Sequence, residues 1–252
     1  MYLTKLEKFF LSISAIFSAS LALPVTVSAM HIMEGYLPVG NFIVWSIIAL
    51  PFVMYGIIRI RRLIKEHKRV LILLAMAGAF VFVISSLKVP SVTGSCSHMT
   101  GTGLAAILFG LGPTIILGLI VLVFQAMLLA HGGFTTLGAN TFSMAIAGPF
   151  LTMILYKAGK RIKLNKMANI LIAVFMGSLF TYIVTALQLA IAHPSEVGGI
   201  GASFVSFALV FAPTQIPLSV IEGILTVLVI IGMEKFAENE LAETSYAEVK
   251  TI

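Results

Sequence analysis

Long apolar runs with few charged residues are the feature that most constrains what this chain can fold into. Only 10% of the 252 residues are charged, whereas soluble domains carry about 25%. Lipid admits only helices and closed barrels, because every backbone polar group there needs an internal partner. The runs are unbroken rather than alternating, which favours helices. We therefore expect an all-α integral membrane protein with apolar runs near Phe42–Ile58, Val70–Leu87, Gly103–Ala130, Thr141–Tyr156, Ala168–Ile191 and Phe207–Gly232.

The basic residues predict how often the chain crosses the membrane. They gather in two loops, Arg59–Arg69 and Lys157–Lys166, and such loops face the cytoplasm. A single crossing by Gly103–Ala130 would put the second loop outside. Two crossings, broken at Gly112 and Pro113, put both loops inside, since glycine and proline interrupt helices. We therefore predict seven membrane helices, with the N-terminal end of the bundle outside and the C-terminus inside.

The first 29 residues resemble a secretory signal. Two lysines precede an apolar stretch, and Val27 and Ala29 stand three and one residues before a cleavage point. Two alternatives remain: an uncleaved anchor helix, or a true start at Met30. Cleavage and the alternative start both leave a free amine on Met30. We expect three segments: a cleaved signal peptide at 1–29, a membrane domain at 30–234 and a polar cytoplasmic tail at 235–252.

Several classes of function are disfavoured by the sequence. The chain has no GxxxxGK[ST] phosphate-binding loop, so we expect it to hydrolyse no ATP itself. It has no HExxH motif, which argues against a membrane metalloenzyme. Its single cysteine, Cys96, excludes an intramolecular disulfide and a CxxC metal site, and is expected to be a packing residue. The net charge of +6 comes largely from the two basic loops and does not indicate nucleic-acid binding.

The predicted outer face is rich in histidine, with His31, His98, His131 and His193 on or near it. His31 would be the second residue after cleavage. There the terminal amine of Met30, the His31 amide and the imidazole Nδ1 can close fused chelate rings around Ni(II), Cu(II) or Co(II). His98 is the best candidate for a fourth nitrogen. The alternative to a metal site is that His31 lies near the N-terminus by chance, and its spacing from the other histidines does not exclude this.

Other polar residues within or between the runs are expected to serve the structure. Gln125 should bond a neighbouring helix, and Asn140 should cap the next helix or hold the N-terminal loop. Glu222 could carry protons across the membrane, but a neutral or paired acid at a helix contact is the better interpretation. His67 lies among basic residues and should be solvated.

Three separated segments resemble the CbiM/NikM family: "MHIMEGYLP", "SHMTGTGLAAILFG" and "VFQAMLLAHGGFTTLGANTFSMAIAGP". That family comprises substrate-binding membrane subunits of energy-coupling-factor (ECF) transporters for cobalt or nickel. The resemblance implies a bundle of seven helices in the cell membrane. It also implies three kinds of partner: a transmembrane coupling subunit, cytoplasmic ATPase subunits and a small accessory membrane protein.

The resemblance also implies the metal ligands, which map to the Met30 amine, the His31 amide and imidazole, and His98. The pair Met33 and Glu34 reads like the cobalt branch, because the nickel branch more often has Pro-Asp there. Co(II) is therefore the expected substrate. Ni(II) is the first alternative, and a secondary transporter without ATPase partners is the second.

Overall fold

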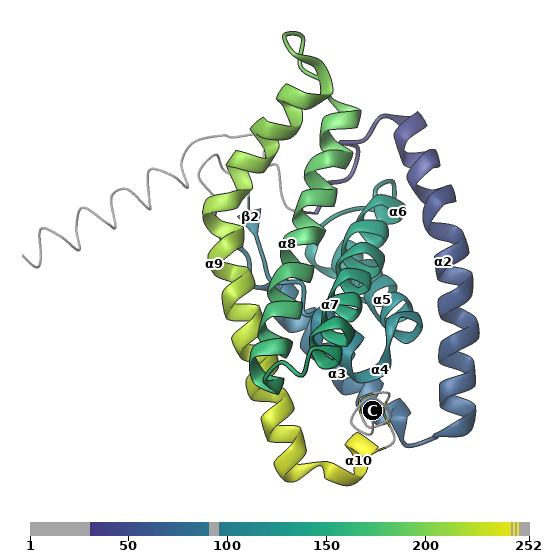
Figure 1. The fold of residues 1–252 in the computed structure, drawn as a ribbon. Helices are drawn as coiled ribbons and strands as arrows, with labels where there is room; N and C mark the ends of the chain where they lie inside the picture. The colour runs from purple at the N-terminus through teal and green to yellow at the C-terminus, as the bar shows by residue number, and fades with distance from the viewer. Residues whose placement is uncertain (1–30, 91–95, 243, 245, 247–252) are drawn as a thin grey trace, which may run out of the picture.

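The computed structural model describes residues 31–90, 96–242, 244 and 246 of the chain (Figure 1). The predicted signal peptide and the Met30 amine lie outside the described residues. The described part is a bundle of helices. The helices are α2 (Val39–Glu66), α3 (Val70–Ser86), α4 (Thr102–Phe109), α5 (Leu111–Leu129), α6 (Leu137–Asn140), the π-helix η1 (Thr141–Ala147), α7 (Gly148–Arg161), α8 (Lys166–Ala192), α9 (Gly199–Phe236) and α10 (Glu238–Ala242).

Two very short strands interrupt the helical pattern. Strand β1 (Val89–Pro90) pairs antiparallel with β2 (Cys96–Ser97). This pairing fixes the backbone immediately before His98. At the C-terminal end, α9 runs on to Phe236 and the short α10 follows it.

Five stretches within the described ranges are long and apolar enough to cross a membrane: α2, α5, the continuous stretch Leu137–Arg161, α8 and α9. Helix α3 is apolar and has 17 residues, just below that length. Helix α4 has only 8 residues, or about 12 Å, so it cannot cross by itself. The expected all-helical membrane architecture is therefore confirmed, while the count of seven crossings stays a prediction.

The long apolar run 103–130 is broken into two helices, but not where the sequence predicts. We expect the break at Gly112 and Pro113; the structure puts it at Gly110, whose φ of 79° and ψ of 177° suit only glycine. Pro113 instead lies in the first turn of α5, where a missing N–H leaves no hydrogen bond unmade. The chain thus reverses two residues earlier than predicted.

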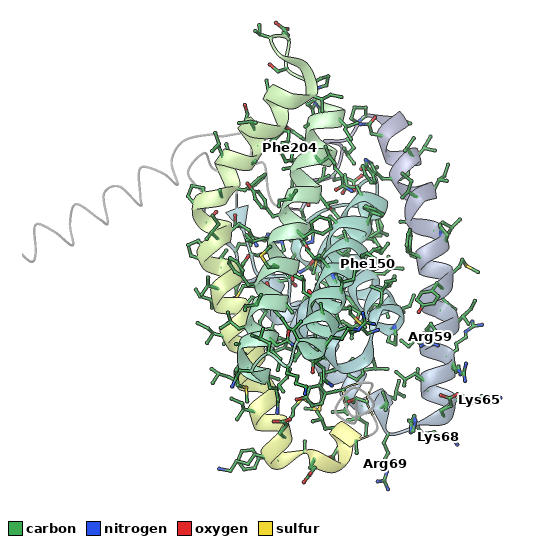
Figure 2. All side chains as sticks on the ribbon, viewed as in Figure 1. Arg59, Lys65, Lys68, Arg69, Phe150 and Phe204 are labelled. Atoms are coloured by element: carbon green, nitrogen blue, oxygen red, sulfur yellow. The ribbon has the colours of Figure 1, made fainter. Side chains whose placement is uncertain are left out.

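The two basic loops lie at one end of the bundle. Arg59, Lys65, Lys68 and Arg69 project at the lower end in Figure 2. Lys166, at the end of the second basic loop, forms an ion pair with Glu234 near the end of α9. Both basic loops therefore lie toward the end of the bundle where α9 finishes.

Helix α5 connects that end to the opposite half. Its first turn packs on α2, since a Cβ on Gly112 would lie 2.5 Å from the Cβ of Arg59. Its last turn leads into His131, whose imidazole contacts His31. The histidines of the loops thus lie away from the basic end of the bundle.

Candidate metal centre

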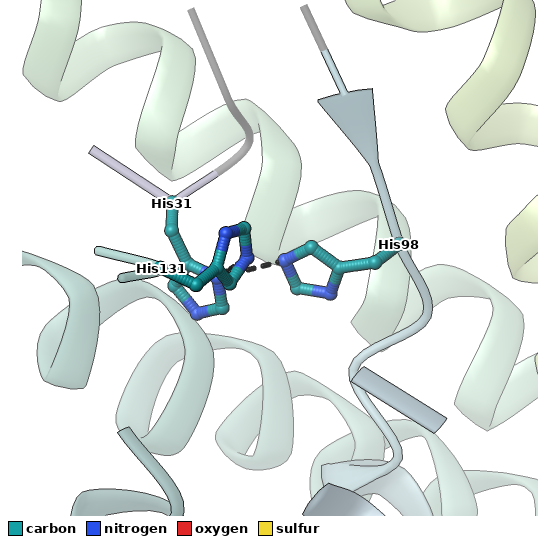
Figure 3. Close-up of side chains that lie close together, drawn as sticks. All are labelled: His31, His98 and His131. Atoms are coloured by element: carbon teal, nitrogen blue, oxygen red, sulfur yellow. Dashed lines mark hydrogen bonds between the residues drawn. The ribbon is translucent and has the colours of Figure 1, made fainter. Parts of the chain in front are cut away.

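Three imidazoles meet inside the bundle although their residues are far apart in the sequence (Figure 3). His31 precedes α2, His98 follows β2, and His131 lies between α5 and α6. Their exposed fractions are 3%, 1% and 1%. One ring nitrogen from each lies within 4.8 Å of the others. The structure thus joins the two predicted imidazole ligands, His31 and His98, and adds a third.

The outer nitrogen of two of these rings already contacts another group, which leaves the inward nitrogens available to a metal ion. His98 Nδ1 lies 2.8 Å from the carbonyl oxygen of Met99, so it carries the proton and donates it there. His31 Nε2 lies 3.1 Å from the sulfur of Met144, a weak acceptor. These contacts leave the lone pairs on His31 Nδ1 and His98 Nε2. Nδ1 of His31 is also the atom that the predicted chelate requires.

The spacing of these nitrogens suits a metal ion with ligands at right angles. His31 Nδ1 lies 2.8 Å from His98 Nε2 and 2.7 Å from His131 Nε2. Two nitrogens bonded at about 2.0 Å lie about 2.8 Å apart at a right angle, and about 3.3 Å apart at a tetrahedral angle. The same spacing fits a hydrogen bond through one shared proton. A bound metal ion would therefore replace that proton and accept all three lone pairs.

His131 is the member of the cluster that the sequence interpretation did not propose as a ligand, because we expected it only near the outer face. Ala130 and Gly132 on either side have φ of 46° and 74°, and this left-handed backbone turns the chain sharply at the end of α5. His131 Nδ1 is buried without a hydrogen-bond partner among the described residues. The available signal was a histidine followed by two glycines directly after an apolar helix, which suggests a tight turn but not its direction.

The backbone beside His31 is held firmly by α6 and the loop before it. The N–H of Ile32 donates to Asn140 Oδ1 at 2.9 Å, and Asn140 Nδ2 donates to the Ile32 carbonyl at 3.0 Å. Thr136 Oγ1 donates to the same carbonyl at 2.7 Å. The predicted role of Asn140 in holding the N-terminal loop is confirmed. This clamp fixes the entry of the chain, so that His31 cannot swing freely away from the other histidines.

A π-helix supplies the other wall of the centre. Helix η1 carries Met144, the sulfur neighbour of His31, and π-helical turns are frequent at functional sites. A small gap beside His31 and His98 is lined by Ser143, Met144, Thr181 and Thr185. The immediate surroundings of the imidazoles are therefore hydroxyl groups and one thioether, with no carboxylate in that lining.

The remaining predicted residues fall outside the cluster. His67 is exposed at the end of α2, as expected of a solvated residue. Gln125 Nε2 donates to Ser85 Oγ at 2.7 Å, which confirms its bond to a neighbouring helix. His193 Nε2 lies 2.9 Å from the carbonyl oxygen of Tyr36 and takes no part in the cluster. The side chain of Cys96 lies outside what the structure describes, so its role stays a prediction.

Burial keeps the imidazoles neutral. It lowers the pKa of His98 to about 4 and, with the nearby His98, that of His131 to about 3. Burial and then the two neighbouring imidazoles hold the pKa of His31 well below its usual range. Neutral imidazole is the form that binds metal ions. The centre is therefore ready for a cation at pH values where an exposed histidine would be protonated.

These pKa values predict how the stability of the metal-free protein depends on pH. The unfolded chain binds protons at histidines below about pH 6.5, while the folded chain leaves His98 neutral down to about 4 and His131 down to about 3. The unfolded state therefore binds more protons in this window, and stability falls as the pH falls. We expect the Tm of chelator-treated protein to drop between pH 7 and 5, and His131→Gln to weaken that dependence. If the Tm of His131→Gln fell between pH 7 and 5 as steeply as that of the wild type, the assignment of His131 as a buried neutral imidazole would be contradicted.

Loss of one cluster imidazole should weaken metal binding more than loss of a histidine elsewhere. We expect His98→Ala and His131→Ala each to reduce Co(II) affinity by more than the 10–100-fold typical of groups that only support a ligand. His67→Ala and His193→Ala serve as matched controls and should bind normally. Isothermal titration of purified proteins measures all four. Normal binding by His98→Ala, or equal defects in cluster and control variants, would refute the assignment.

Comparison with known proteins agrees with this picture of a membrane metal centre. The family model described as "Cobalt uptake substrate-specific transmembrane region" (CbiM) matches residues 31–240. The cobalt transport protein CbiM of Lachnoclostridium phytofermentans is 58% identical over 239 residues, which cover 95% of this chain and 96% of that protein. That of Clostridioides difficile is 51% identical over 227 residues, covering 90% and 91%.

Solved structures of similar fold carry related descriptions. A crystal structure of a transition metal transporter matches with a TM-score of 0.72 and 26% identity, covering 82% of this chain and 94% of that one. A truncated transition metal transporter matches with a TM-score of 0.70 and 25% identity, covering 81% and 98%.

Proposed function

The chain belongs to the CbiM family, and on that premise we propose that it captures Co(II) at the outer face of the cell membrane for ATP-driven uptake. The observation that carries this proposal is the buried meeting of His31, His98 and His131. Burying three neutral imidazoles in a membrane bundle costs free energy, and such residues mark functional sites. A metal ion that passes through this protein as substrate supplies such a function.

Capture from outside is supported by the positions of the charges. The basic loops gather at the end of the bundle opposite to the half where the histidine loops lie. Basic loops face the cytoplasm, so the histidines would lie in the outer half. The seven crossings that we propose count the run 103–130 as two, of which the first, containing α4, is short and would return the chain from the histidine end toward the basic end.

The proposed ligands are the Met30 amine, the His31 amide and Nδ1, and His98 Nε2. The free lone pair of His31 Nδ1 and its 2.8 Å separation from His98 Nε2 support a planar arrangement of four nitrogens. His131 Nε2, which lies 2.7 Å from His31 Nδ1, would be a fifth ligand. A fifth nitrogen suits Co(II), which accepts five or six ligands, better than planar four-coordinate Ni(II). Nickel remains the alternative substrate.

Energy for transport would come from partners. The chain has no phosphate-binding loop, and its resemblance to ECF substrate subunits implies a transmembrane coupling subunit, cytoplasmic ATPase subunits and a small accessory membrane protein. A secondary transporter driven by protons at Glu222 is less well supported. Both oxygens of that carboxylate already accept hydrogen bonds from the protein, which fits a structural acid at a helix contact.

The proposed orientation predicts a labelling pattern in whole cells. Starting from Cys96→Ser, single cysteines at Lys65, Lys163 and Ser195 report on the two basic loops and on the loop between α8 and α9. We expect an impermeant thiol reagent added outside to label only the cysteine at 195. Both basic-loop cysteines should react once the cells are lysed, which shows that they are accessible. Labelling at 163 from outside would overturn the seven crossings.

The proposed terminal amine predicts that the position of His31 matters as much as its presence. Inserting one alanine between Met30 and His31 changes the chelate rings, and extending the terminus converts the amine into an amide that binds metal poorly. We expect each change to abolish high-affinity Co(II) binding, while both proteins still insert into the membrane. Intact mass must first establish the N-terminus of each variant. An extended form that holds cobalt as tightly as the form starting at Met30 would exclude the amine as a ligand.

A further inference from the structure

Helix α9 touches the His98 segment on both sides of the histidine. On one side, Ser97 Oγ lies 2.7 Å from Thr214 Oγ1 of α9. On the other side, Glu222 of α9 accepts hydrogen bonds from Thr100 and Gly101. The two α9 residues are eight positions apart, or about two helical turns. A single helix therefore holds the chain on both sides of His98.

The Glu222 carboxylate is the strongest of these attachments. It is 1% exposed and accepts four hydrogen bonds. The Thr100 N–H and the Ser178 hydroxyl donate to Oε2 at 2.8 and 2.9 Å. The Thr100 hydroxyl and the Gly101 N–H donate to Oε1 at 2.6 and 2.8 Å. Two of these donors are backbone N–H groups, which can only donate, so this position requires an acceptor on both oxygens.

This attachment fixes the backbone around His98. Gly101 has a φ of 70° and packs against α3, since a Cβ there would lie 3.1 Å from the Cα of Val81. The segment after His98 thus turns sharply between α3 and α9, and its two N–H groups find their acceptors on Glu222. Without that carboxylate, two buried N–H groups would lose their partners, which is costly. The direction in which His98 presents Nε2 depends on this turn.

The same network extends toward His31. Thr102 Oγ1 lies 3.3 Å from Thr100 Oγ1 and donates to the Met144 carbonyl at 3.1 Å. Met144 in turn contacts His31 Nε2 through its sulfur. Glu222 therefore lies at the base of a connected set of contacts that reaches both predicted imidazole ligands.

We propose that Glu222 is a positioning residue that sets the geometry of the metal centre by fixing the segment that carries His98, with Thr214 holding its other side. This role rests on the proposed function, because it concerns the geometry of the same metal ion. It differs from an acid that merely joins two helices. It predicts that changes at Glu222 alter how the metal is held, and not only how stable the bundle is.

The test compares Co(II) affinity, the electron paramagnetic resonance spectrum of bound Co(II), and the metal-free Tm in the purified full chain. Glu222→Gln keeps the shape but points an NH₂ group at donors. We expect it to lower Co(II) affinity 10–100-fold, as is typical when a supporting partner of a ligand is lost, and to change the spectrum. Ser203→Ala is the matched control, because Ser203 is also buried in α9 but donates to the His193 carbonyl and not to the Glu222 network. It should keep wild-type affinity and spectrum.

A second pair of variants keeps the test decisive if Glu222→Gln does not fold. Thr100→Val removes one hydroxyl donor to Glu222 at nearly constant volume, and Thr100→Ser keeps it. We expect weaker binding and a changed spectrum in Thr100→Val and recovery of both in Thr100→Ser.

Two results have different meanings. A lower Tm with wild-type cobalt affinity and spectrum, in Glu222→Gln or in Thr100→Val, would overturn the positioning role. Wild-type protein that binds no Co(II) would instead overturn the proposed function, and this inference with it.

Discussion

The burial of three imidazoles at one point is the constraint on which the rest of the centre depends. A buried polar group needs a hydrogen-bond partner, and the protein supplies one to the outer nitrogen of two of the rings. His98 gives its outer N–H to the Met99 carbonyl, and His31 directs its outer nitrogen at the Met144 sulfur. His31 Nδ1, His98 Nε2 and His131 Nε2 face one another, and His131 Nδ1 has no hydrogen-bond partner among the described residues. The close approach of these three nitrogens is favourable around a cation, which makes the buried cluster a candidate metal centre.

The scaffold is organised to hold these groups from several directions. Asn140 clamps the chain beside His31, α9 brackets the segment of His98, and a left-handed turn after α5 aims His131 inward. Apolar side chains cover the lipid-facing sides of α2 and α9, whereas the buried polar residues lie inside. Because these supports come from distant parts of the sequence, movement of one helix would disturb the metal ligands. Such a connection is what a protein that must first bind and then release its substrate requires.

Sequence patterns predicted the helices and two of the three imidazoles, for identifiable reasons. Apolar runs of membrane length are strong signals for membrane helices. His31 and His98 stand in polar segments, where a histidine is not expected to serve only as a packing residue. The helix break lies at Gly110 instead of at Gly112 and Pro113. Proline is tolerated in the first turn of a helix, and the sequence does not show which of two nearby glycines adopts the backbone angles that end one. The position of His131 and the four donors to Glu222 could not be predicted, since both depend on how segments about 40 to 120 residues apart meet in space.

X-ray absorption at the cobalt edge of the purified, metal-loaded protein tests the central claim most directly. The histidine centre predicts a shell of nitrogen ligands at about 2.0 Å, with the outer scattering features of imidazole rings, and loss of part of those features in His131→Ala. A shell dominated by sulfur, or by oxygen without imidazole scattering, would contradict the assignment of His31, His98 and His131 as the place where the metal is held.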